Sequence, residues 1–171
     1  VNIVINKHLK KYCGVLVGTG YNSTDDTTVA IGDATIDNCH TSTTGTTTIG
    51  KAGGGLFGTG YGYKATIKIS NCTNSLEISG ENAGGICGQG AGFYGTMTID
   101  NCHNTAEISG HSAGGICGQG AGRDGSTFII KHCSNTGNIS GCEVANEDTI
   151  YSAGGICGRN AGLDCSTFLI R

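Results

Sequence analysis

Cysteine is the residue type in this sequence with the greatest capacity for chemistry, since thiols form disulfides, bind soft metals and act as nucleophiles. The chain has 10 cysteines in 171 residues, and none of them forms the Cys-x-x-Cys pair that many zinc sites use. Most of them recur at a spacing of about 30 residues and fall into two columns when the segments are aligned. The first column is Cys39, Cys72, Cys102 and Cys133, and the second is Cys87, Cys117 and Cys157.

Two roles remain open for these cysteine columns. In an oxidising compartment they can form disulfides that join neighbouring repeats, and otherwise they are small, buried free thiols. Metal binding is disfavoured, because Cys39-His40 and Cys102-His103 are adjacent residues that point to alternate faces of a strand. We therefore predict structural thiols or disulfides, and neither a metal site nor a cofactor.

Carboxylates and glycine-rich loops offer little sign of catalysis. Asp37 and Asp100 share an outward column, but Ser70 lies between them, which implies a separation of about 9.6 Å across two coils. The segment Gly88–Gly92 lacks the Lys-Ser/Thr pair and the following helix of a phosphate-binding loop, and it recurs from Gly118 onward. We name no catalytic residues and expect a protein that is not an enzyme.

The elements that position these residues are copies of one unit. Residues 97–126 closely match 67–96, and the clear repeats are 34–66, 67–96, 97–127 and 128–167. We predict that 1–171 is a single solenoid fragment of four to five coils, cut from a longer protein because it begins at Val1. The irregular stretches near 22–28 and 142–150 interrupt the spacing and are predicted to be loops that project from corners.

Each unit contains three short segments with strand character. The first alternates apolar and polar residues with a period of two, as a half-buried strand does. Its inward positions form two columns: Ala34, Ile67, Met97, Phe128 and Phe168, and Ile36, Ile69, Ile99, Ile130 and Ile170. The second segment aligns Ile49, Ile78, Ile108 and Ile139. The third aligns Leu16, Leu56, Ile86, Ile116 and Ile156.

These columns indicate an all-β fold, a right-handed parallel β-helix (β-solenoid) with three short strands per coil of about 30 residues. The composition agrees, since 32 glycines suit tight corners and the absence of proline suits strands that pair on both sides. Asparagines also align, with Asn38, Asn71 and Asn101 in one column that ends in His132. Such columns can form hydrogen bonds from coil to coil.

The third segment predicts an assembly face. If isoleucine points inward, strand alternation turns the next residue outward. That outward column is Val17, Phe57, Cys87, Cys117 and Cys157. An apolar stripe of this kind is one that soluble monomers avoid exposing, so we expect a homo-oligomer or filament. The opposite orientation, with cysteine inward and isoleucine outward, would also leave an apolar stripe on the surface.

The glycine-rich segments Gly54–Gly58, Gly84–Gly88, Gly114–Gly118 and Gly154–Gly158 read GGLFG or GGICG, and an Asn-Cys motif precedes most of them. From Ala34 onward the unit resembles the GLUG-motif repeats of secreted and surface proteins, which include adhesin-like chains. A cysteine at the fourth motif position, where an aliphatic residue is expected, departs from that pattern. The resemblance implies an elongated surface or fibre protein, and it implies no catalytic residues.

The function that we predict is a self-associating structural repeat of a surface fibre, filament or adhesin stalk. The alternative is a carbohydrate-binding or carbohydrate-cleaving β-helix. An ice-binding protein is less favoured, because Lys68 interrupts the threonine columns of one face. A net charge of −3 argues against nucleic acid as a partner, and no apolar run approaches the roughly 20 residues that span a membrane.

The expected location is extracellular or surface-exposed, on a cell or a virion, with surface glycans or a host receptor as further partners. Three sequons permit N-glycosylation in a eukaryotic host, at Asn22, Asn71 and Asn138.

Overall fold

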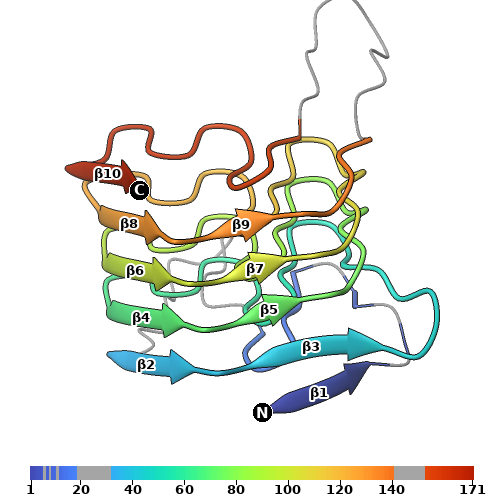
Figure 1. The fold of residues 1–171 in the computed structure, drawn as a ribbon. Coiled ribbons are helices and arrows are strands. Elements are labelled where there is room, and N and C mark those ends of the chain that lie inside the picture. Colours follow the sequence, from blue (N-terminus) through green and yellow to red (C-terminus); the bar gives the residue numbers. More distant parts are fainter. Residues whose placement is uncertain (6, 8, 11, 19–31, 141–152) are drawn as a thin grey trace, which may run out of the picture.

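The computed structural model of the protein describes all residues except 6, 8, 11, 19–31 and 141–152. Every regular element in the described part is a β-strand, and each strand pairs in parallel with its neighbours (Figure 1). The described residues include no helix that is long and apolar enough to cross a membrane. The predicted loops near 22–28 and 142–150 lie outside the described residues.

Two five-stranded sheets run along the molecule. The first has the order β10-β8-β6-β4-β2. Its strands are β2 (Ala34–Asp37), β4 (Thr66–Ser70), β6 (Thr96–Asp100), β8 (Thr127–Lys131) and β10 (Thr167–Ile170). The second has the order β1-β3-β5-β7-β9. Its strands are β1 (Asn2–Ile5), β3 (His40–Thr43), β5 (Thr73–Asn74), β7 (His103–Asn104) and β9 (Ser134–Asn135).

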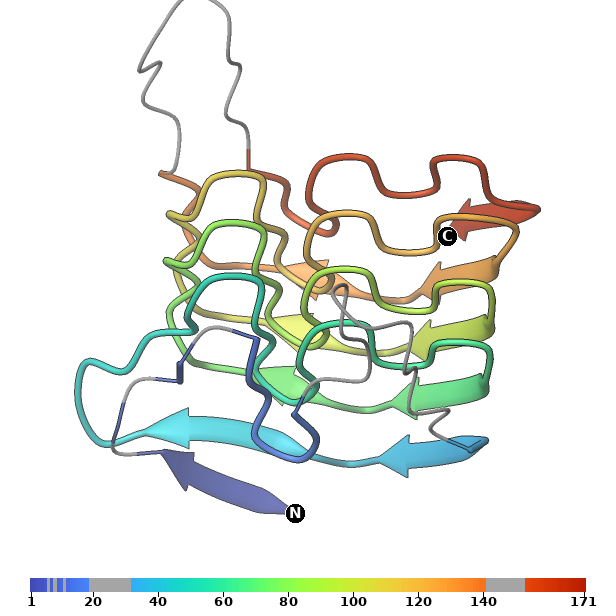
Figure 2. The same cartoon turned by 180° about the vertical axis from the view of Figure 1, so that it is seen from behind.

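The chain winds as a parallel β-solenoid of about 3 turns, with roughly 31 residues per turn. It follows the strands on the near side of Figure 1, returns on the far side seen in Figure 2, and rises from β2 to β10. This course is right-handed. The predicted all-β, right-handed parallel β-helix is therefore confirmed.

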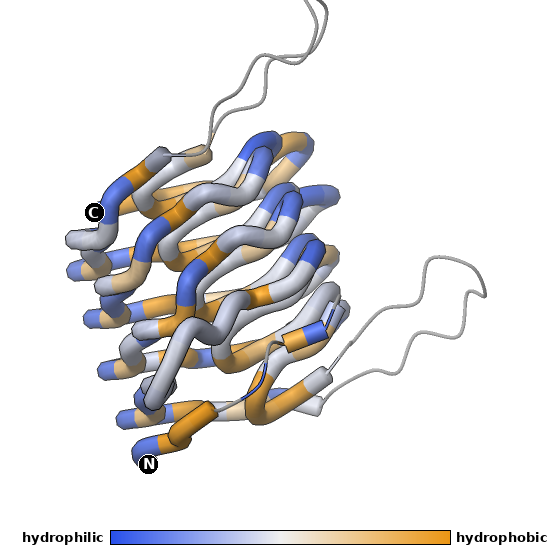
Figure 3. Tube along the Cα trace, turned by 90° about the vertical axis from the view of Figure 1, so that its right-hand side faces the viewer, coloured by the Kyte–Doolittle hydropathy of each residue, from blue (hydrophilic) through white to orange (hydrophobic). Residues whose placement is uncertain are grey.

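The register of the first sheet is the predicted one. Ile69 pairs with Ile99 and Ile99 pairs with Ile130, so equivalent side chains stack from coil to coil. Figure 3 shows hydrophobic segments at matching places in successive coils. The stacked side chains at the centre are at most 1% exposed: Ile67, Ile69, Met97, Ile99, Phe128 and Ile130. Each buried isoleucine contributes about 1.5–3 kcal/mol of hydrophobic stabilisation, so these columns form the main core.

The other two predicted strands are shorter than expected. The Ile78 and Cys87 segments pair with the next coil only through isolated bridges, such as Ile78 to Ile108 and Cys87 to Cys117. A short strand that the sequence pattern does not reveal, β5 or its equivalent, follows each corner instead. The strands β5, β7 and β9 have two residues each, too few to display a period of two, so periodicity does not detect them.

Replacement of Ile99 by aspartate tests the stacked core. Ile99 is fully buried between Ile69 and Ile130, so the carboxylate would be unpaired in an apolar column. We expect the free energy of unfolding to fall by about 4 kcal/mol or more in denaturant titration. The matched control is Thr98→Asp on the outward face of the same strand, which should change that energy by less than about 1 kcal/mol. Equal effects of the two variants would show that the register is wrong.

Candidate functional site

The corner between the two sheets carries the densest polar network of the structure. Asn38, Asn71, Asn101 and His132 occupy this corner in successive coils, with left-handed φ angles of 52° to 56°. Asparagine tolerates this region better than most residues because its short side chain forms local hydrogen bonds. The predicted asparagine column with His132 at its end is therefore present, and the corner conformation explains its composition.

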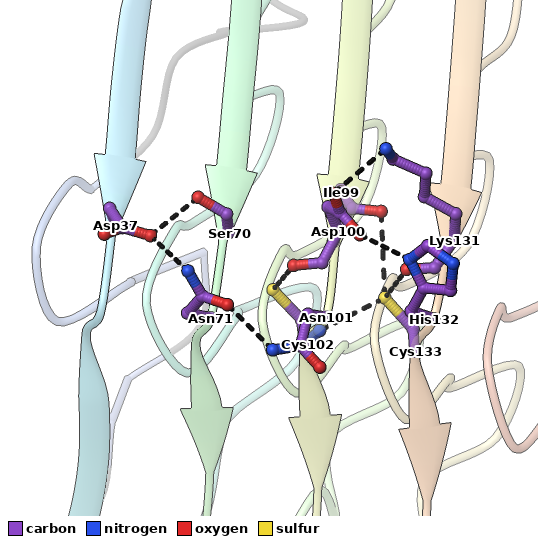
Figure 4. A network of polar contacts seen from close by, with 10 residues as sticks. All are labelled: Asp37, Ser70, Asn71, Ile99, Asp100, Asn101, Cys102, Lys131, His132 and Cys133. Carbon is purple, nitrogen blue, oxygen red and sulfur yellow. Dashed lines mark hydrogen bonds and ion pairs between the residues drawn. The ribbon is translucent and has the colours of Figure 1, made fainter.

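The corner side chains are linked from coil to coil, and we call this set the corner ladder (Figure 4). Asn71 Nδ2 donates to Asp37 Oδ1 at 2.7 Å, and Asn101 Nδ2 donates to Asn71 Oδ1 at 2.7 Å. Ser70 Oγ also donates to Asp37 Oδ1 at 2.7 Å. Each coil thus satisfies the polar groups of its neighbour, which ties the coils together along the outer edge.

The two acidic residues of the corner ladder, Asp37 and Asp100, have different partners. Lys131 Nζ lies 3.0 Å from Asp100 Oδ2, and His132 Nδ1 lies 2.9 Å from Asp100 Oδ1. The contacts with His132 and then Lys131 lower the pKa of Asp100, and the hydrogen bonds from Ser70 and Asn71 lower the pKa of Asp37. Both groups are held as carboxylates, which suits a structural role.

A second asparagine column lies inside the solenoid. Asn74 Nδ2 donates to Asn104 Oδ1 at 2.8 Å, and Asn104 Nδ2 donates to Asn135 Oδ1 at 2.7 Å. Thr41 Oγ1 begins this row by donating to Asn74 Oδ1 at 2.9 Å. Asn74 and Asn104 have no exposed surface, so the buried amides are paired with one another and with backbone carbonyls.

The first cysteine column follows the corner directly and points into the core. Each thiol donates to the backbone carbonyl two residues earlier; Cys72 Sγ, for example, lies 3.1 Å from Ser70 O. The same contact recurs at Cys39, Cys102 and Cys133. All nine described cysteines are free, so the alternative of structural thiols describes this structure and no disulfide occurs among them.

Thiols of neighbouring coils also contact one another in this column. The hydrogen bond with Cys102 lowers the pKa of Cys72 to about 7 and also lowers the pKa of Cys133. The contacts with Cys133 and then Cys72 raise the pKa of Cys102. A thiol that donates to a neighbouring sulfur stabilises that neighbour as a thiolate and is itself harder to ionise. The column therefore alternates between thiols that are easier and harder to ionise.

The predicted outward stripe of the third segment is absent. Phe57, Cys87 and Cys117 have no exposed surface, while Val17 and Cys157 pack partly buried against the same core. The isoleucines or leucines that precede them in the interior coils are also fully buried. Both residues of each pair thus point inward, and the prediction that one of them lies on the surface is wrong.

The local backbone explains this error. The N–H groups of Ile86 and Cys87 both donate to Ile116 O, at 2.9 and 3.0 Å, which an alternating strand does not do. A Cβ on Gly84 would overlap the carbonyl oxygen of Cys87, so the chain folds back tightly here and needs glycine. Because the segment is a bend between two isolated bridges, strand alternation does not apply to its side chains.

A cluster that the sequence patterns do not single out lies at the corner before the first sheet, and we call it the aromatic corner. The rings of Tyr63 and Tyr94 meet edge to face at 5.8 Å, with Lys64 Nζ 5.3 Å from the Tyr63 ring centroid. In the next coil the Arg123 guanidinium lies 5.7 Å from the Phe93 centroid. Tyr94 is 55% exposed. The signal in the sequence is the recurrence of aromatic and basic residues at equivalent repeat positions.

The remaining predicted sites are the N-glycosylation sequons at Asn22, Asn71 and Asn138. Asn71 and Asn138 are exposed, but the Asn71 side chain is engaged in the corner ladder. Asn22 lies outside the described residues. No group of three or more His, Cys, Asp or Glu side chains in the described ranges is placed to hold a metal ion.

Comparison with models of protein families, with curated proteins and with solved structures finds no match for this chain. The resemblance to GLUG-motif repeats therefore stays a prediction.

The corner ladder predicts acid sensitivity. Carboxylates whose pKa is lowered in the folded state stabilise the fold above the pKa of the unfolded chain, and this contribution is lost as pH falls through the folded pKa. We expect the melting temperature to fall as pH drops below about 4. The melting temperature of the double variant Asp37→Asn with Asp100→Asn should fall by less than that of the native chain over the same pH range. Asp164→Asn, outside the ladder, is the control, and equal acid profiles for all three proteins would contradict the prediction.

Proposed function

We propose that this protein is a structural module of a surface fibre, filament or adhesin stalk, in which coils stack end to end. The support is the repetitive core, because columns of apolar, amide and thiol side chains recur through the coils of β4 to β9. A solenoid whose coils contact only their neighbours can lengthen without any new kind of interface. Rigid, extended spacers are a common use of such architectures.

The observation that carries this proposal is the pairing of equivalent core residues in register from coil to coil, as in Ile69, Ile99 and Ile130. Ile108 and Ile130 are fully buried, whereas their column neighbours Ile139 and Ile170 are 51% and 52% exposed. Strand β10 also lies at the edge of its sheet, with backbone groups ready to pair. A further coil would cover both features.

A second copy of the chain can provide that coil. The opposite edge of the first sheet is β2, which carries Ala34 and Ile36 of the same two columns. Pairing of β10 from one copy with β2 of the next would repeat the contacts that the internal coils make. Such a contact is head to tail, so it generates open filaments instead of closed dimers.

Sedimentation velocity at increasing protein concentration tests this association. We expect the native chain to form concentration-dependent oligomers. Ile170→Lys should reduce them strongly, because stacking would bury its charge, while the free chain leaves position 170 half exposed. Thr167→Lys on the outward face of the same strand is the control and should associate like the native chain. A native chain that stays monomeric at every concentration would overturn the proposal.

A carbohydrate-binding role is the second candidate, and the aromatic corner is the observation that favours it. The exposed ring of Tyr94 offers a stacking face to a sugar ring, and the nearby Lys64 offers a hydrogen-bond donor. Tyr94 holds a left-handed φ of 53°, which is unfavourable for a tyrosine. The equivalent residues Lys64, Asp124 and Asp164 have the same conformation, with φ of 51° to 56°, so the corner of the repeat imposes it.

Glycan-array binding of the native chain and of Tyr94→Ala tests this second candidate. If the aromatic corner binds sugars, the native chain should retain a defined set of glycans and the variant should lose at least about tenfold in affinity, as expected when a stacking contact is removed. Tyr12→Ala, an exposed tyrosine elsewhere on the chain, is the control. If the native chain binds no glycan, or if Tyr94→Ala binds as well as the native chain, the aromatic corner does not bind carbohydrate.

A further inference from the structure

Cys102 and Cys133 form the most closely associated pair of thiols in the first cysteine column. The backbone N–H of Cys102 donates to the Cys133 sulfur at 3.4 Å, so this sulfur leans toward the neighbouring coil. The proximity of the two thiols also lowers the pKa of Cys133 and raises that of Cys102. No equivalent contact from a backbone N–H to a neighbouring sulfur joins the other described coils, which sets this pair apart.

The geometry of stacked coils permits a covalent bond between these two residues. Parallel strands lie about 4.8 Å apart, and disulfides join Cα atoms that are about 4.4–6.8 Å apart. Both cysteines directly follow a left-handed corner residue, Asn101 or His132, and therefore lie outside the paired strands. Their side chains are thus free of the strand pleat, which orients the Cβ atoms of paired residues poorly for a disulfide.

Access differs between the two thiols. Cys102 has no exposed surface, whereas Cys133 is partly exposed. Cys133 is also the member of the pair whose thiolate is favoured, because its contact with Cys102 lowers its pKa. Thiolates attack disulfides, so the more easily ionised thiol is the one that reacts first.

We propose that Cys102 and Cys133 are a dithiol that a small disulfide oxidant converts reversibly into a disulfide bond between two neighbouring coils. The Cys133 thiolate attacks one sulfur of the oxidant, forms a mixed disulfide and releases the other half as a thiolate. The Cys102 sulfur then attacks the Cys133 sulfur and displaces the second half. Two protein thiols lose two electrons and two protons, and one oxidant disulfide becomes two thiols.

The second cysteine column is less suited to this reaction. Cys87 and Cys117 have no exposed surface, and burial raises the pKa of Cys117. Its neighbour Cys157 also has a raised pKa, first because of its hydrogen bond with Cys117. Cys157 is partly exposed, as Cys133 is, but neither Cys117 nor Cys157 is favoured as a thiolate, so the column should stay reduced under conditions that oxidise Cys102 and Cys133.

The disulfide would fasten the coil of β6 and β7 to the coil of β8 and β9. It joins residues 31 positions apart in sequence, so it closes one complete turn of the solenoid. The coils could then no longer separate when the stack is stretched or heated. This inference concerns neighbouring coils of one chain and does not depend on the end-to-end association proposed above.

Peptide mapping after oxidation with glutathione disulfide tests the pair. Cys142→Ser serves as the background, because Cys142 shares a peptide with Cys133. Free thiols are first blocked in denaturant, and the chain is then cleaved after Lys, Arg and Glu. Cys133 lies in peptide 132–143 and Cys117 in peptide 108–123. Cys87 and Cys102 lie together in peptide 82–107. We expect 82–107 to be linked to 132–143, with a mass loss of two hydrogens and no retained glutathione.

Further variants in the Cys142→Ser background identify which cysteines form the link. Cys102→Ser should lose the link and keep one glutathione on 132–143, because the second attack has no nucleophile. Cys87→Ser should keep the link, which shows that its partner in 82–107 is Cys102. Circular dichroism of each variant establishes that it is folded. A folded background chain that gains only glutathione adducts, links 82–107 to 108–123, or remains fully reduced would overturn the proposal.

Discussion

Parallel backbone pairing between successive coils is the interaction on which the rest of this structure depends. A single turn of about 31 residues cannot enclose its own apolar side chains, so each coil is stable only against its neighbours. Pairing in register places Ile99 between Ile69 and Ile130, and equivalent residues stack in the same way along the whole sheet. A slip of one residue would turn these isoleucines to the solvent, so the register and the core stabilise each other.

The corner shows how the same constraint selects polar residues. A left-handed backbone is needed at the same place in every coil, and asparagine both tolerates it and reaches the next asparagine. The cysteine that follows satisfies a carbonyl of its own corner, as Cys72 does with Ser70. Because similar side-chain contacts recur at the corner of successive coils, they form continuous ladders. Residues that look like candidate ligands in the sequence are thus engaged in contacts that hold coils together.

Much of this fold can be predicted from the sequence, because alignment of the repeats already brings equivalent residues into the same columns. The isoleucine columns, the parallel register and the asparagine corner all follow from that alignment. The third segment cannot be predicted in the same way. Its orientation depends on a tight bend at Gly84 that brings both Ile86 and Cys87 inward, and periodicity alone does not reveal such a bend. The aromatic corner is harder to predict because equivalent positions differ in residue type, as in Tyr63, Phe93 and Arg123, so alignment shows no uniform column there.

Nuclear Overhauser effects between isoleucine methyl groups, in protein labelled only at those methyls, test the stacked register most directly. Ile99 should show contacts to both Ile69 and Ile130, which are 30 and 31 residues away in sequence, and Ile108 should show a contact to Ile78. The same spectrum should contain no contact between Ile69 and Ile130 of comparable strength, because Ile99 separates them. Absence of the two Ile99 contacts in a folded sample would contradict the coil-on-coil arrangement described here.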